Sequence, residues 1–237
     1  MVRLFEGAIR NWRFVLGFLA VSLAVWLAEF AYQFYGFSQG ELVPSVLRAS
    51  SLTGATFIGL SLLSSSIFKW VPRYARYWYV RRSLGVVGVF FSLVHVLLVM
   101  DSLLGWNFGL LFGTLNPFEN PLIFGALALP IFVLMTLTST DWAVQRMGFP
   151  RWKFLHRLVY PAYLFMVFHF LLVYPQALMN LAGYALIAVT MAALAGELFW
   201  FVKTVWMRKA GPVGSLSGII LIFLWLVFAY FSYVRLA

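Results

Sequence analysis

Three histidines are the residues of this chain with the clearest capacity for chemistry. His95, His156 and His169 each lie in strongly apolar sequence, and the last two stand thirteen residues apart in the stretch LHRLVYPAYLFMVFHF. An imidazole can bind a metal through either ring nitrogen or transfer a proton near neutral pH. A lone histidine in such surroundings is more often a hydrogen-bonded packing residue. Because all three are placed this way and none lies in a loop, the pattern favours a functional role.

The apolar sequence that must position these histidines predicts membrane-spanning helices. The chain is 63% hydrophobic and 10% charged, and runs of roughly 18 or more apolar residues are typical of spans. Lipid offers no hydrogen-bond partners to the backbone, so these runs form helices in one bundle. We therefore expect an all-α integral membrane protein, as a single transmembrane domain over residues 1–237. Seven spans are predicted, at residues 14–35, 47–68, 83–104, 120–139, 156–174, 178–201 and 215–234.

The basic residues predict the orientation, because cytoplasmic loops retain Lys and Arg. Fifteen of the 17 basic residues precede the first span or lie between spans two and three, four and five, and six and seven. We expect these segments, including the N-terminus, on the cytoplasmic side of the plasma (inner) membrane. The first span has too long an apolar run for a signal peptide and is interpreted as an anchor. The net charge of +10 then reflects topology and contact with membrane lipid rather than nucleic-acid binding.

Depth in the membrane separates the histidines. Thirteen residues of helix rise roughly 20 Å, about two-thirds of the hydrocarbon thickness. His156 is therefore expected near the cytoplasmic face and His169 towards the outer face. His95, thirteen residues beyond Arg82, lies at about the depth of His169. Two imidazoles at equal depth on two helices can bind haem iron from both sides, a ligation suited to electron transfer. We predict that His95 and His169 bind an outer haem.

His156 has no such partner. At its depth the third span carries Arg81 and Arg82, and neither guanidinium can bind iron while charged. If His156 also binds haem iron, the second ligand is a residue other than histidine, an open position or a group from elsewhere. One haem is therefore predicted, and a second is left open. On an ideal helix His156 and His169 point some 140° apart, a phase that Pro161 between them can alter.

Other polar residues are candidates for supporting roles. Arg48 could pair with an outer haem propionate, and Arg81 and Arg82 with an inner propionate or a flavin phosphate. Anchoring at the interface and topology are the alternative explanations. Glu197, six residues from Lys203, is expected to pair locally or to reach the interface. The chain has no cysteine, which excludes disulfides, cysteine-ligated iron–sulfur clusters and thiolate-ligated or covalently attached haem.

Two segments resemble a known family. RRSLGVVGVFFSLVH (81–95) resembles the third helix of the ferric reductase-like transmembrane domain family. TSTDWAVQRMGFPRWKFLHRLVYPAYLFMVFH (138–169) is similar to the segment that leads into its fifth helix. The branch that it resembles most is that of the MsrQ (YedZ) haem-binding membrane subunits, through the Leu-His-Arg-Leu-Val-Tyr motif and the later histidine. The resemblance covers about residues 50–175.

This resemblance implies a six-helix bundle that binds haem b and carries electrons across the membrane as part of an oxidoreductase system. The family-like core would cover about residues 50–202, with a seventh helix at about 215–234. The resemblance also allows FMN as a cofactor. The implied donor is a cytoplasmic flavin reductase or a quinol. The implied acceptor is an extracytoplasmic redox protein, which in that branch is a molybdopterin methionine sulfoxide reductase.

Two other functions are compatible with the sequence. The chain could be a membrane ferric or cupric reductase, whose acceptor is a metal ion at the outer surface. From a different class, it could be a haem-free transporter or assembly factor in which the histidines only pack. A reducible haem spectrum in the purified protein would separate both redox functions from the haem-free one.

Overall fold

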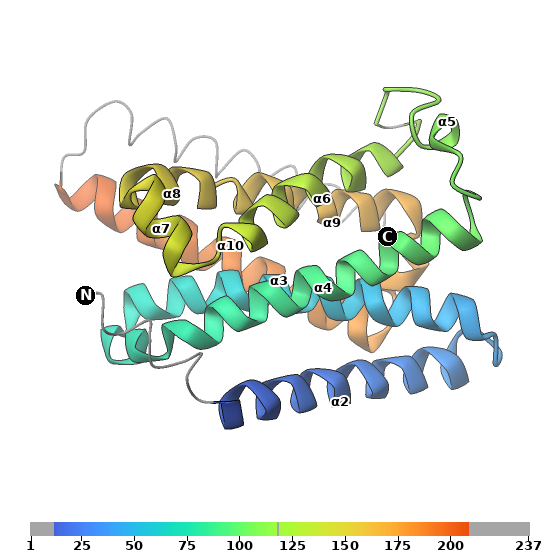
Figure 1. Ribbon diagram of the computed structural model, residues 1–237, viewed down its shortest axis with the longest axis horizontal. Coiled ribbons are helices and arrows are strands. Elements are labelled where there is room, and N and C mark those ends of the chain that lie inside the picture. Colours follow the sequence, from blue (N-terminus) through green and yellow to red (C-terminus); the bar gives the residue numbers. More distant parts are fainter. Residues whose placement is uncertain (1–11, 118, 209–237) are drawn as a thin grey trace.

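The computed structural model describes residues 12–117 and 119–208, so the predicted span at 215–234 lies outside the described residues. Every regular element in the described ranges is a helix (Figure 1). In chain order these are α2 (Trp12–Gly36), α3 (Leu42–Trp70), η1 (Pro72–Tyr77), α4 (Trp78–Ser102), α5 (Phe108–Leu111), α6 (Leu122–Leu137), α7 (Asp141–Met147), α8 (Phe149–His156), α9 (Val159–Val173), η2 (Pro175–Leu178) and α10 (Leu181–Arg208).

The predicted all-α membrane architecture is confirmed. Five helical stretches are long and apolar enough to cross a membrane, and α6 with α7 makes a sixth if this bent pair forms one span. The first six predicted spans each coincide with one of these stretches. The fourth is shorter than predicted: α6 has 16 residues, and α7 turns away from it by 94°.

The fifth span is divided into two helices. The α8 helix ends at His156 and α9 begins at Val159, although together they are still long enough to span a membrane. Pro161 explains the break, because it has no N–H to donate to the Arg157 carbonyl four residues earlier. Gly148, with φ of +77°, forms the turn between α7 and α8. Together these features place His156 at a helix end and His169 within a helix.

The α3 helix is the centre of the bundle. It packs against α4, α10 and α2, whereas α6 packs on α9 (Figure 1). In α3, 56% of the most apolar 18-residue window is buried, whereas in α2 only 6% of the corresponding window is buried. The α2 helix is therefore peripheral. The main apolar core lies between α3 and α9 and includes Leu52, Ile58, Tyr163 and Leu171. This packing holds the helices that carry His95 and His169 against a common support.

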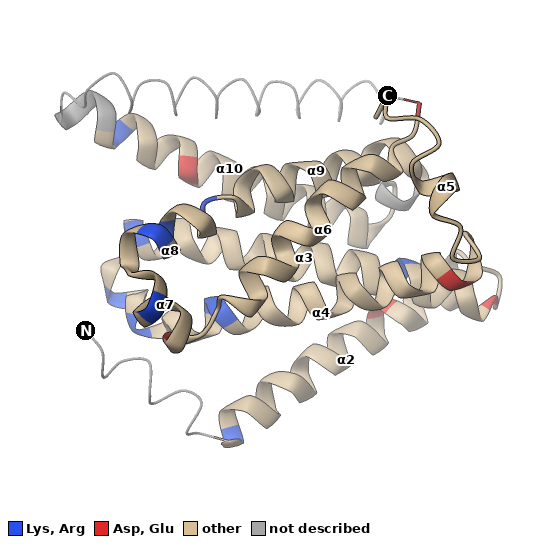
Figure 2. Cartoon of the chain, turned by 45° about the horizontal axis from the view of Figure 1, so that its top comes forward, with Lys and Arg blue, Asp and Glu red and all other residues tan. Residues whose placement is uncertain are grey.

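Charge is segregated along the bundle. We call the end that carries η1, α7 and α8 the inner end, and the end that carries the turn at 37–41 and α5 the outer end. Figure 2 shows Lys and Arg gathered around α7, α8 and the neighbouring ends of α3 and α4. This distribution agrees with the charge pattern of the predicted orientation, in which the inner end faces the cytoplasm. The orientation itself stays a prediction.

Two glycines bring α3 and α4 into close contact. A Cβ atom built on Gly54 would lie 2.7 Å from the Ser92 Oγ atom, and one built on Gly88 would lie 2.8 Å from an Ile58 side-chain carbon. Small residues at such crossings allow helix backbones to approach closely, which is a main source of helix association in lipid.

We expect Gly88→Val to destabilise the bundle by about 2 kcal/mol, because the added carbons force α3 and α4 apart. The thermal unfolding midpoint of the purified protein measures this effect. Gly17→Val on α2 is the matched control, since a Cβ there meets nothing within 4 Å. Equal midpoints for the two variants would show that this crossing does not depend on the glycine.

Candidate functional site

His95 is held by a backbone carbonyl of the central helix. It lies on α4, and its Nδ1 atom is 3.2 Å from the Leu47 carbonyl oxygen of α3. A carbonyl oxygen can only accept a hydrogen bond, so Nδ1 carries the ring proton and donates it. The neutral ring then has its lone pair on Nε2, directed away from α3. Histidines that bind a metal through one ring nitrogen usually donate the N–H of the other nitrogen to a carbonyl or carboxylate, which fixes this tautomer.

His169 is held in the same way from a different helix pair. It lies on α9, and its Nδ1 atom is 3.1 Å from the carbonyl oxygen of Pro121, the residue before α6. The lone pair of the neutral ring is therefore again on Nε2. Gly125 of α6 faces this ring, and a Cβ there would lie 3.3 Å from Nδ1. The ring thus fits against α6 because residue 125 has no side chain.

His95 and His169 are held alike on two different helices, α4 and α9, and both are partly buried in the bundle. Each offers an Nε2 lone pair, and each is oriented by a backbone carbonyl 48 residues away in the sequence. Two neutral imidazoles are the axial ligand set of a low-spin haem. The described residues contain no cluster of three or more His, Asp or Glu side chains, so these two histidines match a two-ligand haem rather than a many-ligand metal site.

His156 is held differently. Its Nε2 atom is 3.1 Å from the Thr138 hydroxyl, and that hydroxyl donates to the Leu134 carbonyl at 2.8 Å. Since a hydroxyl has one proton to donate, it accepts from His156 Nε2–H. The Trp152 ring stacks on the imidazole with 4.1 Å between centroids. Unlike the outer pair, His156 therefore has its Nε2 occupied by a side chain and lies beside Arg81 and Arg82.

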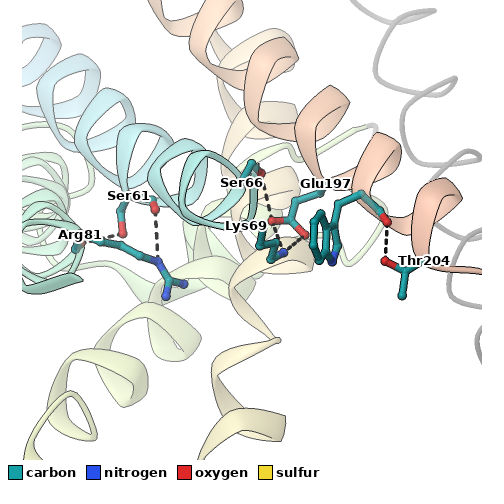
Figure 3. Close-up of polar contacts among 7 residues, drawn as sticks. Ser61, Ser66, Lys69, Arg81, Glu197 and Thr204 are labelled. Carbon is teal, nitrogen blue, oxygen red and sulfur yellow. Dashed lines mark hydrogen bonds and ion pairs between the residues drawn. The ribbon is translucent and has the colours of Figure 1, made fainter. Parts of the chain in front are cut away.

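The three predicted arginines have different surroundings. Arg82 forms an ion pair with Asp141 at 3.1 Å and donates to the Ser139 carbonyl, so it ties α4 to the start of α7. Arg81 donates from Nε to the Ser61 carbonyl at 3.3 Å (Figure 3). Its guanidinium also lies over the Trp78 ring. Arg48 is at the outer end, where its guanidinium contacts Tyr174 and the turn at 37–41. The structure thus groups Arg81 and Arg82 with His156 and places Arg48 apart from them.

A buried ion pair between α3 and α10 differs from the sequence prediction. Glu197 does not pair locally with Lys203; both its carboxylate oxygens accept from Lys69 Nζ, at 2.6 and 2.5 Å, and one also accepts from Ser66 at 3.0 Å (Figure 3). Lys203 instead lies over the Trp70 ring. The partners Lys69 and Glu197 are 128 residues apart, so nothing in their sequence spacing could have indicated the pair.

Comparison with known proteins gives a family match over the same helices. A family model described as "Ferric reductase like transmembrane component" matches residues 49–167, which include His95 and His156 and end two residues before His169.

Three similar relatives share the name "Protein-methionine-sulfoxide reductase heme-binding subunit MsrQ". The relative from Agrobacterium fabrum is 36% identical over 97 residues, which cover 39% of this chain and 42% of that protein. Those from Brucella ovis and Brucella suis are each 29% identical over 135 residues, or 56% of both chains. The chain thus spans about half the length of the curated relatives it matches.

Proposed function

Because the chain belongs to the family of ferric reductase-like transmembrane components, we propose that it is a membrane b-type cytochrome. It carries electrons from a donor at the cytoplasmic face to an acceptor outside. The observation that supports this most directly is the matched pair of outer histidines, each with Nδ1 bonded to a backbone carbonyl. The relatives named as haem-binding subunits of a methionine sulfoxide reductase support the same class of function.

His95 and His169 are the residues that would hold the iron of one haem. The haem supplies a one-electron redox centre when it is bound. The Leu47 and Pro121 carbonyls keep the two rings in the iron-binding tautomer, and the hydrogen bonds that they accept raise the basicity of the ligating nitrogens. The two carbonyls come from α3 and from Pro121, the residue before α6, and the two histidines from α4 and α9.

The partners that we propose follow the orientation of the bundle. The electron donor is a cytoplasmic flavin reductase or a quinol, and it acts at the inner end, where the basic residues gather. FMN is a candidate second cofactor there, near Arg81, Arg82 and His156. The acceptor at the outer end is an extracytoplasmic methionine sulfoxide reductase. We also propose that residues 1–237 form a single transmembrane domain.

The absorbance spectrum of the purified full-length protein tests the haem. We expect a Soret band and a sharp α band on reduction, which are typical of a low-spin bis-histidine centre. We also expect about one haem per chain. A colourless protein from haem-replete cells would rule out both redox functions. The rate at which the reduced protein is reoxidised then identifies the acceptor: faster oxidation by a methionine sulfoxide reductase than by ferric citrate is expected. The reverse order would favour a metal reductase.

We expect Gly125→Val to weaken haem retention about tenfold, because the added side chain displaces the His169 ring that faces this position. Haem per protein after gel filtration measures the effect, and Gly17→Val serves as the control for a valine on a spanning helix. Full haem occupancy in Gly125→Val would show that the His169 position does not depend on this contact.

A further inference from the structure

A polar cavity lies at the outer end of the bundle, away from the inner cluster of arginines. It has a volume of about 70 Å³ and opens on one side. The ends of α2, α3, α9 and α10 meet around it, so in the predicted orientation it lies at the level of lipid head groups rather than in the hydrocarbon. Its lining residues are Gln33, Phe37, Arg48, Tyr174, Gln176 and Asn180.

Arg48 brings an unneutralised positive charge to this cavity. Its guanidinium donates to the Tyr174 hydroxyl at 3.1 Å, lies over the Tyr174 ring, and makes two longer contacts with Phe37 and Ser38. All of these partners are uncharged. The two ion pairs within residues 12–117 and 119–208, Lys69–Glu197 and Arg82–Asp141, do not involve Arg48. A half-buried guanidinium of this kind favours an anionic partner with several acceptor oxygens.

Gln33, another residue that lines this cavity, has an unpaired acceptor. Its side chain is fully buried, and its Nε2 atom donates to Glu29 at 2.7 Å. The amide oxygen consequently points the other way and has no hydrogen-bond partner among the described residues. A buried acceptor without a donor is costly. Because the Glu29 carboxyl group polarises the amide from behind, the Gln33 oxygen favours a positively charged donor.

We propose that this cavity binds the head group of an amine-bearing phospholipid. The phosphate accepts from Arg48, and the ammonium group donates to the Gln33 oxygen. At 10–15 Å³ for each water-sized group, the cavity has room for about five such groups, which is enough for the phosphate-to-amine part of the head group. The acyl chains then lie along α2, whose apolar side chains are exposed along most of its length.

Competition between lipids tests this proposal on the full-length protein. Native mass spectrometry counts the lipids retained from equimolar phosphatidylethanolamine, its N,N-dimethyl derivative and phosphatidylcholine, all with the same acyl chains. These head groups carry three, one and no N–H donors. We expect retention to fall in that order, with about a tenfold difference between the first and the last. Equal retention of the three lipids by the wild-type protein would overturn the proposal without any variant.

Variants assign the two contacts. Gln33→Leu should remove the preference among the three lipids, whereas Gln145→Leu, at an exposed position of α7, should keep it. Arg48→Gln should weaken retention of all three, compared with the exposed Arg151→Gln. A preference that survives Gln33→Leu would contradict the assigned acceptor.

Two further outcomes would also contradict the proposal. Retention of phosphatidylglycerol equal to that of phosphatidylethanolamine would remove the role of the amine, and displacement of bound lipid by millimolar inorganic phosphate would identify free phosphate as the ligand. The haem absorbance of each variant is recorded alongside. Loss of haem in Arg48→Gln would place this guanidinium on a haem propionate and would contradict the lipid site.

Discussion

Replacement of either His95 or His169 by alanine should remove the same haem from the purified protein. Both Nε2 atoms are proposed to bind the same haem iron, so the loss of either would leave the haem weakly retained. His156→Ala should keep that haem, because its Nε2 is bonded to Thr138 rather than free. Haem per protein and the Soret position, measured for the three variants, give the result.

A rescue experiment separates lost ligation from lost folding. His95→Gly leaves a space that free imidazole can enter, and addition of imidazole should restore the low-spin reduced spectrum. Full haem loss in His156→Ala, with His95→Ala unaffected, would show that the pairing of His95 with His169 is wrong. Loss in all three variants, with no rescue by imidazole, would mean that these substitutions act through the fold.

Lys69→Ala should destabilise the protein by about 2 kcal/mol. The Glu197 carboxylate would remain in a mostly buried position without its cationic partner, and an unpaired charge in such a place is strongly unfavourable. The figure is below the usual cost of breaking a buried pair because the Lys69 side chain is 31% exposed and water screens part of the interaction. The thermal unfolding midpoint of the purified protein measures the loss.

A double variant distinguishes a charge effect from a packing effect. Lys69→Met combined with Glu197→Gln removes both charges and should recover most of the stability lost in Lys69→Ala. Lys203→Ala, which removes a cation that lies over the Trp70 ring, is the control and should shift the midpoint little. If the double variant is as unstable as Lys69→Ala, the ion pair is not the source of the effect.

The helices were predictable because hydropathy reports directly what lipid requires of a backbone. The six spans within the described residues follow from long apolar runs. The equal depth expected for His95 and His169 follows from helix rise alone and stays a prediction. The division of the fifth span was foreseeable in part, since Pro161 was recognised as a point where the helix phase could change. The 94° turn between α6 and α7 was not predicted, because Thr138 and Ser139 give no strong signal for it.

The partners of the polar side chains were not predictable, and the reason is physical. Leu47 and Pro121 act on the histidines through carbonyl oxygens, which every residue has, so their types carry no information about the contact. Glu197 had a nearby lysine at a plausible spacing, but its actual partner, Lys69, is brought to it by the packing of α10 on α3. Only the three-dimensional arrangement distinguishes these pairings.

The use of main-chain acceptors has a genetic consequence. An alanine scan would leave both carbonyls in place, so a mutational survey of side chains would not detect the contacts that the backbones of residues 47 and 121 make with the histidines. The proposed iron-binding form of each ring is therefore insulated from sequence change at its partner, as long as the helices keep their register. An amide-to-ester exchange in the backbone, which weakens one carbonyl acceptor without altering any side chain, would reveal a dependence that conventional mutagenesis passes over.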